Sequence, residues 1–129
     1  LYGKLRPYLD KGVLVEFEGI CSTDVIVFKS NNELNEKLLS YLVHMDSFRE
    51  FAIRTMTGVN HPRTSWRALG QFSMPLPSSH IQKKITSILS AVDEKIEKED
   101  TKKKSLEELF KTLLHNLMTG KLRVNHLEV

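Results

Sequence analysis

The residues best suited to binding chemistry gather in two polar segments of the first half of the chain. One is an opening turn around Pro7, and the other is the loop at residues 57–65. Arginine and asparagine make paired hydrogen bonds to guanine and adenine edges, while hydroxyl groups commonly hold phosphates. We therefore predict that these segments contact nucleic acid, although the same side chains also cap or solvate turns. The candidate contacts are Lys4, Arg6, Asn60, His61, Arg63, Ser65 and Arg67.

Patterns for catalysis or metal binding are weaker. The five histidines show no metal-ligand spacing with one another or with the single cysteine, and the six glycines form no phosphate-binding loop. A metal-dependent nuclease could use the four carboxylates near the predicted strands, and a thiol hydrolase could use Cys21. Solvent exposure explains the carboxylates more simply, and a lone cysteine beside a strand is usually part of the core. We predict a non-catalytic chain without metal or cofactor. The four carboxylates are Asp10, Glu16, Glu18 and Asp24.

Length and composition indicate a globular chain that is long enough for one domain. The chain has 129 residues, of which 40% are hydrophobic and 27% charged. A net charge of +3 permits nucleic-acid binding without requiring it. No apolar run is long enough for a transmembrane helix, so no membrane partner is expected. A single cysteine suits a reducing cytosol, and we predict a cytoplasmic location.

Residues 1–78 mix strand and helix patterns without βαβ regularity, so the predicted fold class is α+β. All four prolines and five of the six glycines lie in this part of the chain. Asn31 or Asn32 is the expected cap of the first helix, Asp46 of the second and Ser65 of a single helical turn. The predicted strands are 13–17, 25–28 and 72–76, and the predicted helices are 34–42, 46–54 and 66–69.

The remainder of the chain predicts one very long helix. Ser79 and Gln82 fit a capping box at its start, and Gly120 marks its end. The apolar stripe of such a helix must pack against another long helix, as in an antiparallel coiled coil. The polar stretch 95–105 interrupts this stripe. It is either a solvated or register-setting layer, or a turn near Asp100. The predicted interface residues are Ile85, Ile88, Val92, Leu106, Phe110, Leu113 and Leu117.

Several short segments, taken in order, resemble the specificity (S) subunit of type I restriction-modification enzymes. They are KLRPYL, ICSTDVIVF, TGVNHPRTSW, LSAVDEKIEK and LLHNLMTGKLRV. Each is weak alone, but their order and spacing together are specific and span nearly the whole chain. The resemblance covers the later part of a target recognition domain and the long helix that follows it. We therefore expect a C-terminal fragment of a longer subunit.

The resemblance implies a role in DNA recognition. In this family each of two recognition domains reads half of a split DNA site, and two antiparallel helices set the spacing. Methyltransferase (M) subunits bind these helices, and a restriction (R) subunit adds cleavage. By this analogy residues 1–78 are a partial recognition domain, 79–120 a spacer helix and 121–129 a tail. The expected partners are double-stranded DNA, M and R subunits, and a second long helix from elsewhere in the chain or from a second copy. The alternative is a helix-mediated dimerisation fragment without autonomous DNA binding.

Overall fold

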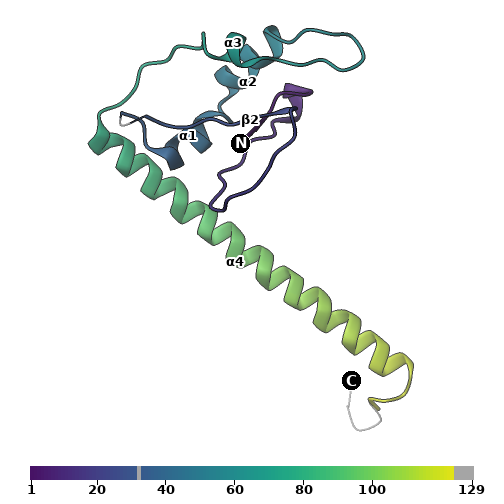
Figure 1. Cartoon of the computed structure of the whole chain (residues 1–129). Helices are drawn as coiled ribbons and strands as arrows, with labels where there is room; N and C mark the ends of the chain where they lie inside the picture. The colour runs from purple at the N-terminus through teal and green to yellow at the C-terminus, as the bar shows by residue number, and fades with distance from the viewer. Residues whose placement is uncertain (32, 124–129) are drawn as a thin grey trace. The chain divides into compact units, whose positions relative to one another are not determined.

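The computed structural model describes residues 1–31 and 33–123. It has two compact units, Leu1–Ser87, here called the head, and a second unit that begins at Ile88. Short elements are followed by one long helix, so the α+β class is confirmed (Figure 1). In chain order the elements are β1 (Tyr2–Gly3), the 3₁₀ helix η1 (Pro7–Leu9), β2 (Val25–Ile26), α1 (Glu36–Leu42), α2 (Asp46–Arg54), α3 (Trp66–Leu69) and α4 (Ser79–Met118).

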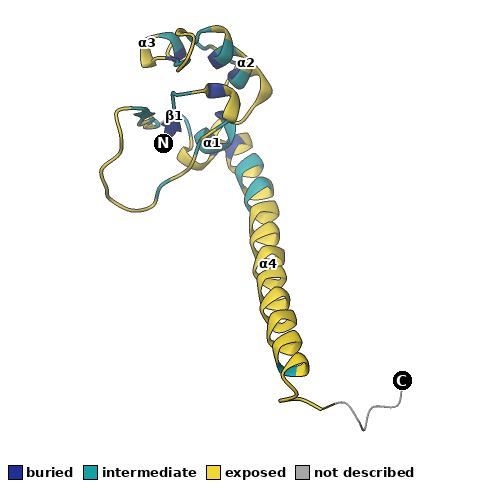
Figure 2. Ribbon diagram, turned by 90° about the vertical axis from the view of Figure 1, so that its right-hand side faces the viewer, coloured by how far each residue is buried: buried dark blue, intermediate teal, exposed yellow. Residues whose placement is uncertain are grey.

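The core of the head forms around β1. Strands β1 and β2 pair antiparallel, with Tyr2 opposite Ile26. Tyr2 is only 1% exposed, and its ring lies 5.5 Å from that of Phe48 in an edge-to-face arrangement. Figure 2 shows the buried residues within the head. The core side chains are Tyr2, Val43, Phe48, Ala52 and Leu69.

The short helices lie close to their predicted positions, but two of their caps differ. Helix α2 covers the predicted residues 46–54, yet its N-cap is Met45, and the Asp46 carboxylate instead pairs with Arg49 at 2.6 Å. Helix α1 is capped by Asn35, whose side chain accepts from the Leu38 amide; Asn31 precedes this helix, and Asn32 lies outside the described residues. An asparagine caps only when it stands next to the first helical residue, so the expected caps were placed too early.

Two predicted strands are not formed. Residues 13–17 and 72–76 carry alternating apolar side chains, but neither segment is a strand within the described residues; only Val13 exchanges backbone hydrogen bonds, with Leu1 at 2.8 and 2.9 Å. Phe17 is 77% exposed, whereas Phe72 packs into the core 5.2 Å from the ring of Phe48. A strand requires a neighbour to complete its hydrogen bonds, which an alternating pattern alone does not provide. Cys21 follows the first of these segments; it was expected in the core, but it is exposed.

Helix α4 begins at the predicted Ser79, but the expected capping box is wrong. Gln82 is 3% exposed, and its side chain turns to other parts of the head. Its carbonyl oxygen accepts from the Asn35 amide at 3.0 Å. Its amide group donates to the carbonyls of Glu33 at 2.8 Å and Pro77 at 2.9 Å. Gln82 therefore joins the start of α4 to the cap of α1.

The long helix is continuous through the polar stretch. Helix α4 runs for 40 residues from Ser79 to Met118, so the turn considered near Asp100 is not formed. Gly120 follows the helix with a φ of 70°, as a helix stop signal requires. No helix in the described ranges 1–31 and 33–123 is both long and apolar enough to cross a membrane.

We expect Gln82→Met to lower the free energy of unfolding by about 1–3 kcal/mol. Methionine has a similar volume but leaves the amide of Asn35 and the carbonyl of Glu33 without their partner. Urea unfolding followed by circular dichroism measures the change. The matched control is Gln71→Met at an exposed position, which we expect to be neutral. Equal stability of the two variants would contradict the anchoring role of Gln82.

Candidate nucleic-acid interface

The backbone brings the two predicted contact segments side by side. The backbone amide of Lys4 donates a hydrogen bond to the carbonyl of Asp24 at 2.9 Å. The carbonyl of Lys4 accepts one from the backbone amide of Thr64 at 3.0 Å. The Arg6 amide donates to the carbonyl of Pro62 at 2.8 Å, and Leu5 forms a bridge with Arg63. The opening turn and the later loop are therefore adjacent parts of one surface.

The loop between Thr57 and Arg63 is closed at its base. Reciprocal backbone hydrogen bonds of 2.8 and 2.9 Å join these two residues. Gly58 has a φ of 94°, and an added Cβ would lie 3.3 Å from the carbonyl oxygen of His61. Only glycine adopts this backbone conformation without strain. The closed base presents Val59, Asn60 and His61 to solvent; Val59, a position that sequence analysis did not select, is 96% exposed.

Arg63 forms an ion pair that the sequence analysis did not find. Its Nε donates to Oδ1 of Asp24 at 2.8 Å, and its Nη2 donates to Oδ2 at 3.3 Å. The hydrogen bonds from Arg63 and its positive charge lower the pKa of Asp24. The hydrogen bonds to the Asp24 carboxylate and its negative charge raise the pKa of Arg63. The guanidinium group of Arg63 thus holds the loop to the β2 side of the surface. To contact a base edge, the Arg63 side chain would have to release Asp24 or bind Asp24 and the base at the same time.

Arg6 and Lys4 supply positive charge beside the loop. Arg6 is exposed and has a φ of 51°, in the left-handed region that non-glycine residues rarely adopt. Such backbone strain costs about 1–3 kcal/mol and persists only where neighbouring structure enforces it. Here the hydrogen bond from the Arg6 amide to the carbonyl of Pro62 ties this residue to the later loop. Lys4 is partly buried next to Asp24.

Ser65 and Arg67 lie at the start of α3. The Ser65 hydroxyl accepts from the Ala68 amide at 3.2 Å and caps the helix as predicted, so this oxygen already has a structural partner. Arg67 is exposed on the same turn. Between them Trp66 is 60% exposed, and its ring lies 5.6 Å from that of Phe28. Tryptophan and arginine are enriched among the residues that contribute most to binding interfaces, and Trp66 is not among the contacts predicted from the sequence.

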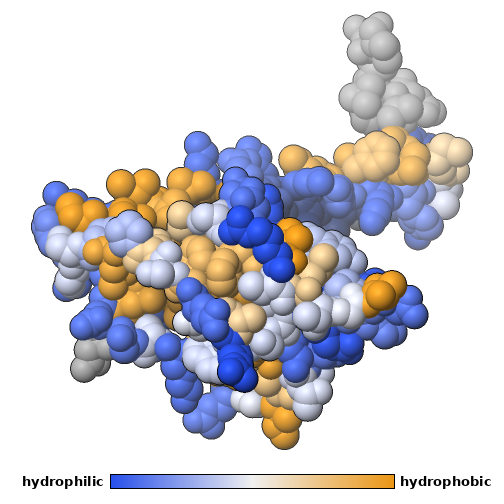
Figure 3. Space-filling model, turned by 90° about the horizontal axis from the view of Figure 1, so that it is seen from above, coloured by the Kyte–Doolittle hydropathy of each residue, from blue (hydrophilic) through white to orange (hydrophobic). Residues whose placement is uncertain are grey.

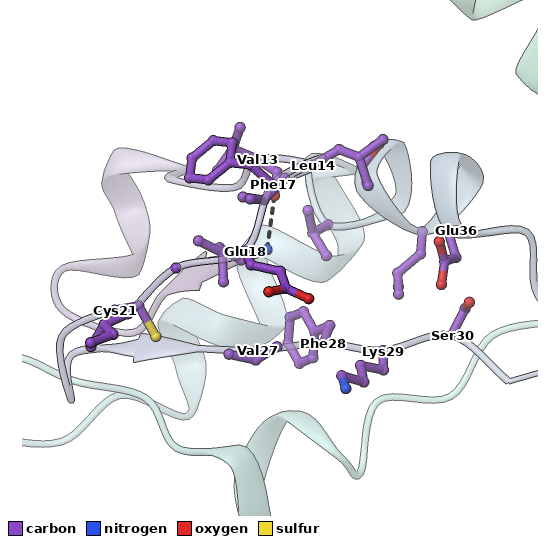
Figure 4. Close-up of a pocket in the computed structure, with 17 residues that line it drawn as sticks. Val13, Leu14, Phe17, Glu18, Cys21, Val27, Phe28, Lys29, Ser30 and Glu36 are labelled. Carbon is purple, nitrogen blue, oxygen red and sulfur yellow. Dashed lines mark hydrogen bonds between the residues drawn. The ribbon is translucent and has the colours of Figure 1, made fainter.

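A separate cavity of about 620 Å³ lies in the head beside residues 13–20. Figure 4 shows Val13, Leu14, Phe17 and Phe28 along it, with Glu18, Lys29 and Cys21 also drawn. Phe17 and Ile20 are largely exposed, and Figure 3 shows several hydrophobic patches separated by hydrophilic side chains. No group of three or more histidine, cysteine or acidic residues suited to a metal occurs in the part of the chain that the structure describes.

Comparison with known proteins identifies the class of this chain. Residues 8–108 match the type I restriction modification DNA specificity domain, and the chain belongs to this family. It is 29% identical over 101 residues to the type I restriction enzyme MjaVIII specificity subunit of Methanocaldococcus jannaschii. It is 26% identical over 77 residues to the type I restriction enzyme EcoDI specificity subunit of Escherichia coli.

The matched regions cover only part of each relative. The match to the first relative takes in 78% of this chain and 24% of that subunit. The match to the second takes in 60% of this chain and 17% of that subunit. The chain therefore spans about a quarter of the first relative and about a sixth of the second. The resemblance seen in the sequence is confirmed at the level of the family.

The Asp24–Arg63 pair predicts acid sensitivity. Because the pKa of Asp24 is lowered in the folded head, its contribution to stability is present above the ordinary pKa of 3.8. That contribution is lost as the pH falls through the lower folded value. We expect Asp24→Asn to be less stable than the wild type at neutral pH and equally stable once the wild-type carboxylate is protonated.

Thermal unfolding of both proteins at a series of pH values measures this difference. The control is Asp93→Asn at an exposed position of α4. The difference in stability between this variant and the wild type should not change over the pH range in which Asp24 titrates. A stability difference for Asp24→Asn that is independent of pH would contradict the ion-pair interpretation.

Proposed function

We propose that this chain is a DNA-recognition module of a type I restriction-modification system. In this proposal it reads one half of a bipartite site and docks methyltransferase subunits through α4. The observation that carries the proposal is family membership across residues 8–108, a range that takes in most of the candidate surface and most of the long helix. The module itself performs no catalysis, and its assembly with methyltransferase and restriction subunits belongs to the same proposal.

The head supports DNA contact through its combination of fixed loops and exposed polar groups. Arg6, His61 and Arg67 are exposed on segments that backbone hydrogen bonds or a helix cap hold in place. Positive side chains on a rigid scaffold bind phosphates without a large loss of entropy on binding. Asn60 at the loop tip is the candidate for reading a base edge, because its amide both donates and accepts.

Two of the predicted contacts receive supporting roles in this proposal. Arg63 positions the loop through Asp24, and Ser65 caps α3. Both residues would affect DNA binding mainly through the shape of the surface. The direct contacts proposed are therefore Lys4, Arg6, Asn60, His61 and Arg67.

Helix α4 supports docking because its apolar stripe is exposed. Phe110 is 66% exposed and Leu106 is 55% exposed, although large apolar side chains are usually covered. A partner helix or a methyltransferase subunit would cover them. The division into residues 1–78, 79–120 and 121–129 is part of this proposal, and the tail from residue 124 lies outside the described residues.

We expect binding to a mixed-sequence DNA duplex to weaken steeply with salt. The logarithm of the association constant should fall with the logarithm of salt concentration, since lysine and arginine release phosphate counterions. Arg6→Gln and Arg67→Gln should each weaken binding by about tenfold and reduce the salt slope by about one. Fluorescence anisotropy over a salt series provides both quantities.

The matched control is Lys98→Gln, which removes one exposed charge from α4. It should change binding much less than the head variants. If all three variants bind DNA equally, the proposed surface is wrong. If the wild type does not bind DNA at all, the alternative of an interaction fragment without autonomous DNA recognition is favoured.

Docking through α4 is tested by co-purification with the methyltransferase subunit of the same system. Phe110→Asp should abolish the complex, because the new carboxylate would lose water in an apolar interface. Thr101→Asp introduces the same charge at an exposed position away from the apolar stripe and should leave the complex intact. Retention of the complex by Phe110→Asp would contradict docking through this stripe.

A further inference from the structure

The loop between Thr57 and Arg63 has the form of a narrow β-ribbon. The reciprocal hydrogen bonds of these two residues join its arms at the base. The Arg63 arm is also bridged to Leu5, so a third backbone segment supports the ribbon. The major groove of DNA is about 12 Å wide and admits a two-stranded ribbon, whereas the minor groove is only about 6 Å wide. The shape of the loop therefore suits the major groove.

Two adjacent side chains at the tip of this ribbon are open to solvent. Val59 is 96% exposed, and its neighbour Asn60 is also exposed. Within the described ranges 1–31 and 33–123, the side chain of Asn60 forms no hydrogen bond. Its amide group therefore keeps both its donor and its acceptor for a ligand.

The chemistry of these two side chains matches the major-groove edge of an A·T base pair. There adenine presents the N7 acceptor and the N6 donor, and thymine presents a C5-methyl group. The Asn60 amide can donate to N7 and accept from N6 at the same time, while the methyl groups of Val59 can pack against the thymine methyl. A G·C pair carries no methyl group. Its guanine presents two acceptors, so the Asn60 oxygen would face an acceptor.

The tip of the ribbon is held in place before any ligand binds. The Nη1 of Arg63 donates to the carbonyl of His61 at 3.2 Å, while the same guanidinium group pairs with Asp24. This pairing also neutralises the acidic side chain nearest the loop in the ion-pair network. The Arg6 amide is bonded to Pro62 at 2.8 Å, so its positive charge lies beside the ribbon. Phosphate contacts fix the position of a reading element, and base contacts give it specificity.

We propose that the tip of this loop reads an A·T base pair through the major groove, with Asn60 bonding the adenine and Val59 contacting a thymine methyl group. This inference rests on the DNA-recognition function proposed above and names the base pair that the head selects. A single exposed valine is common on protein surfaces and is not by itself evidence of a role. The inference is carried by its position next to an unbonded amide on a fixed ribbon. Arg63 acts here as a positioning residue.

Base analogues in a selected duplex test both contacts. Selection by the full chain from a randomised double-stranded DNA library gives the preferred sequence. Fluorescence anisotropy then compares that duplex with analogues substituted at one A·T pair at a time. Uracil in place of thymine removes only the C5-methyl group, and 7-deazaadenine in place of adenine removes only the N7 acceptor. Both changes lie in the major groove and preserve base pairing.

We expect each analogue to weaken wild-type binding at the contacted position. Uracil should cost about fourfold in affinity, as expected for one buried methyl group, and 7-deazaadenine about tenfold. Val59→Ala should lose the sensitivity to uracil, and Asn60→Ala should lose the sensitivity to 7-deazaadenine. Each variant is compared with itself on paired duplexes, so a general loss of affinity cancels.

The matched controls remove similar side chains outside the loop. Ile20→Ala removes an apolar side chain that is 104% exposed, and Gln71→Ala removes an exposed amide. Both controls should keep the wild-type sensitivity to the two analogues. Circular dichroism of each variant verifies that it is folded.

The A·T inference and the DNA-recognition proposal fail separately. A preferred duplex without A·T pairs, or a wild type indifferent to both analogues, overturns the inference and leaves sequence-selective DNA binding intact. The same holds if Val59→Ala and Asn60→Ala keep the full wild-type sensitivities. A folded wild type that binds neither the library nor a mixed-sequence duplex counts against both proposals.

Discussion

The double pairing of the segment that begins at Tyr2 is the constraint on which the head depends. At its start this segment pairs with β2 and forms a bridge with Gly12, and at its end it meets the residues on either side of Arg63. The same segment buries Tyr2, whose burial and, to a lesser extent, the nearby Asp10 carboxylate raise its pKa to about 12. Without this central segment, neither the aromatic core nor the loop after Thr57 would have a fixed position.

This arrangement connects packing to the candidate surface. Because the later loop is held against Lys4–Arg6, residues that are more than fifty positions apart in the chain form one continuous face. The ion pair between Asp24 and Arg63 adds a side-chain link between the start of β2 and the later loop. Fixed loops of this kind suit recognition, since the order required for binding is already present in the free protein.

Local signals in the sequence predicted the local structure well. The helix at 46–54, the Ser65 cap and the end of α4 at Gly120 each depend on residues within one or two helical turns. The family resemblance found from ordered short segments is likewise confirmed. The antiparallel packing and the DNA-contact residues remain proposals.

Features that depend on distant residues were not predictable in the same way. The Asp24–Arg63 pair joins residues 39 positions apart, and Gln82 reaches Asn35 across 47 positions. The alternating residues at 13–17 resemble a strand, but whether they pair depends on which other strand is available. Likewise Gln82 fits a capping box by spacing, while its burial beside α1 gives it different partners.

Photochemical crosslinking of the full chain to a randomised double-stranded DNA library, followed by peptide mass spectrometry, tests the central claim most directly. The account predicts crosslinks in the peptides that contain residues 4–6 and 58–67, lost at high salt together with binding. Crosslinks confined to α4, or spread evenly over the chain, would contradict recognition by the paired turn and loop of the head.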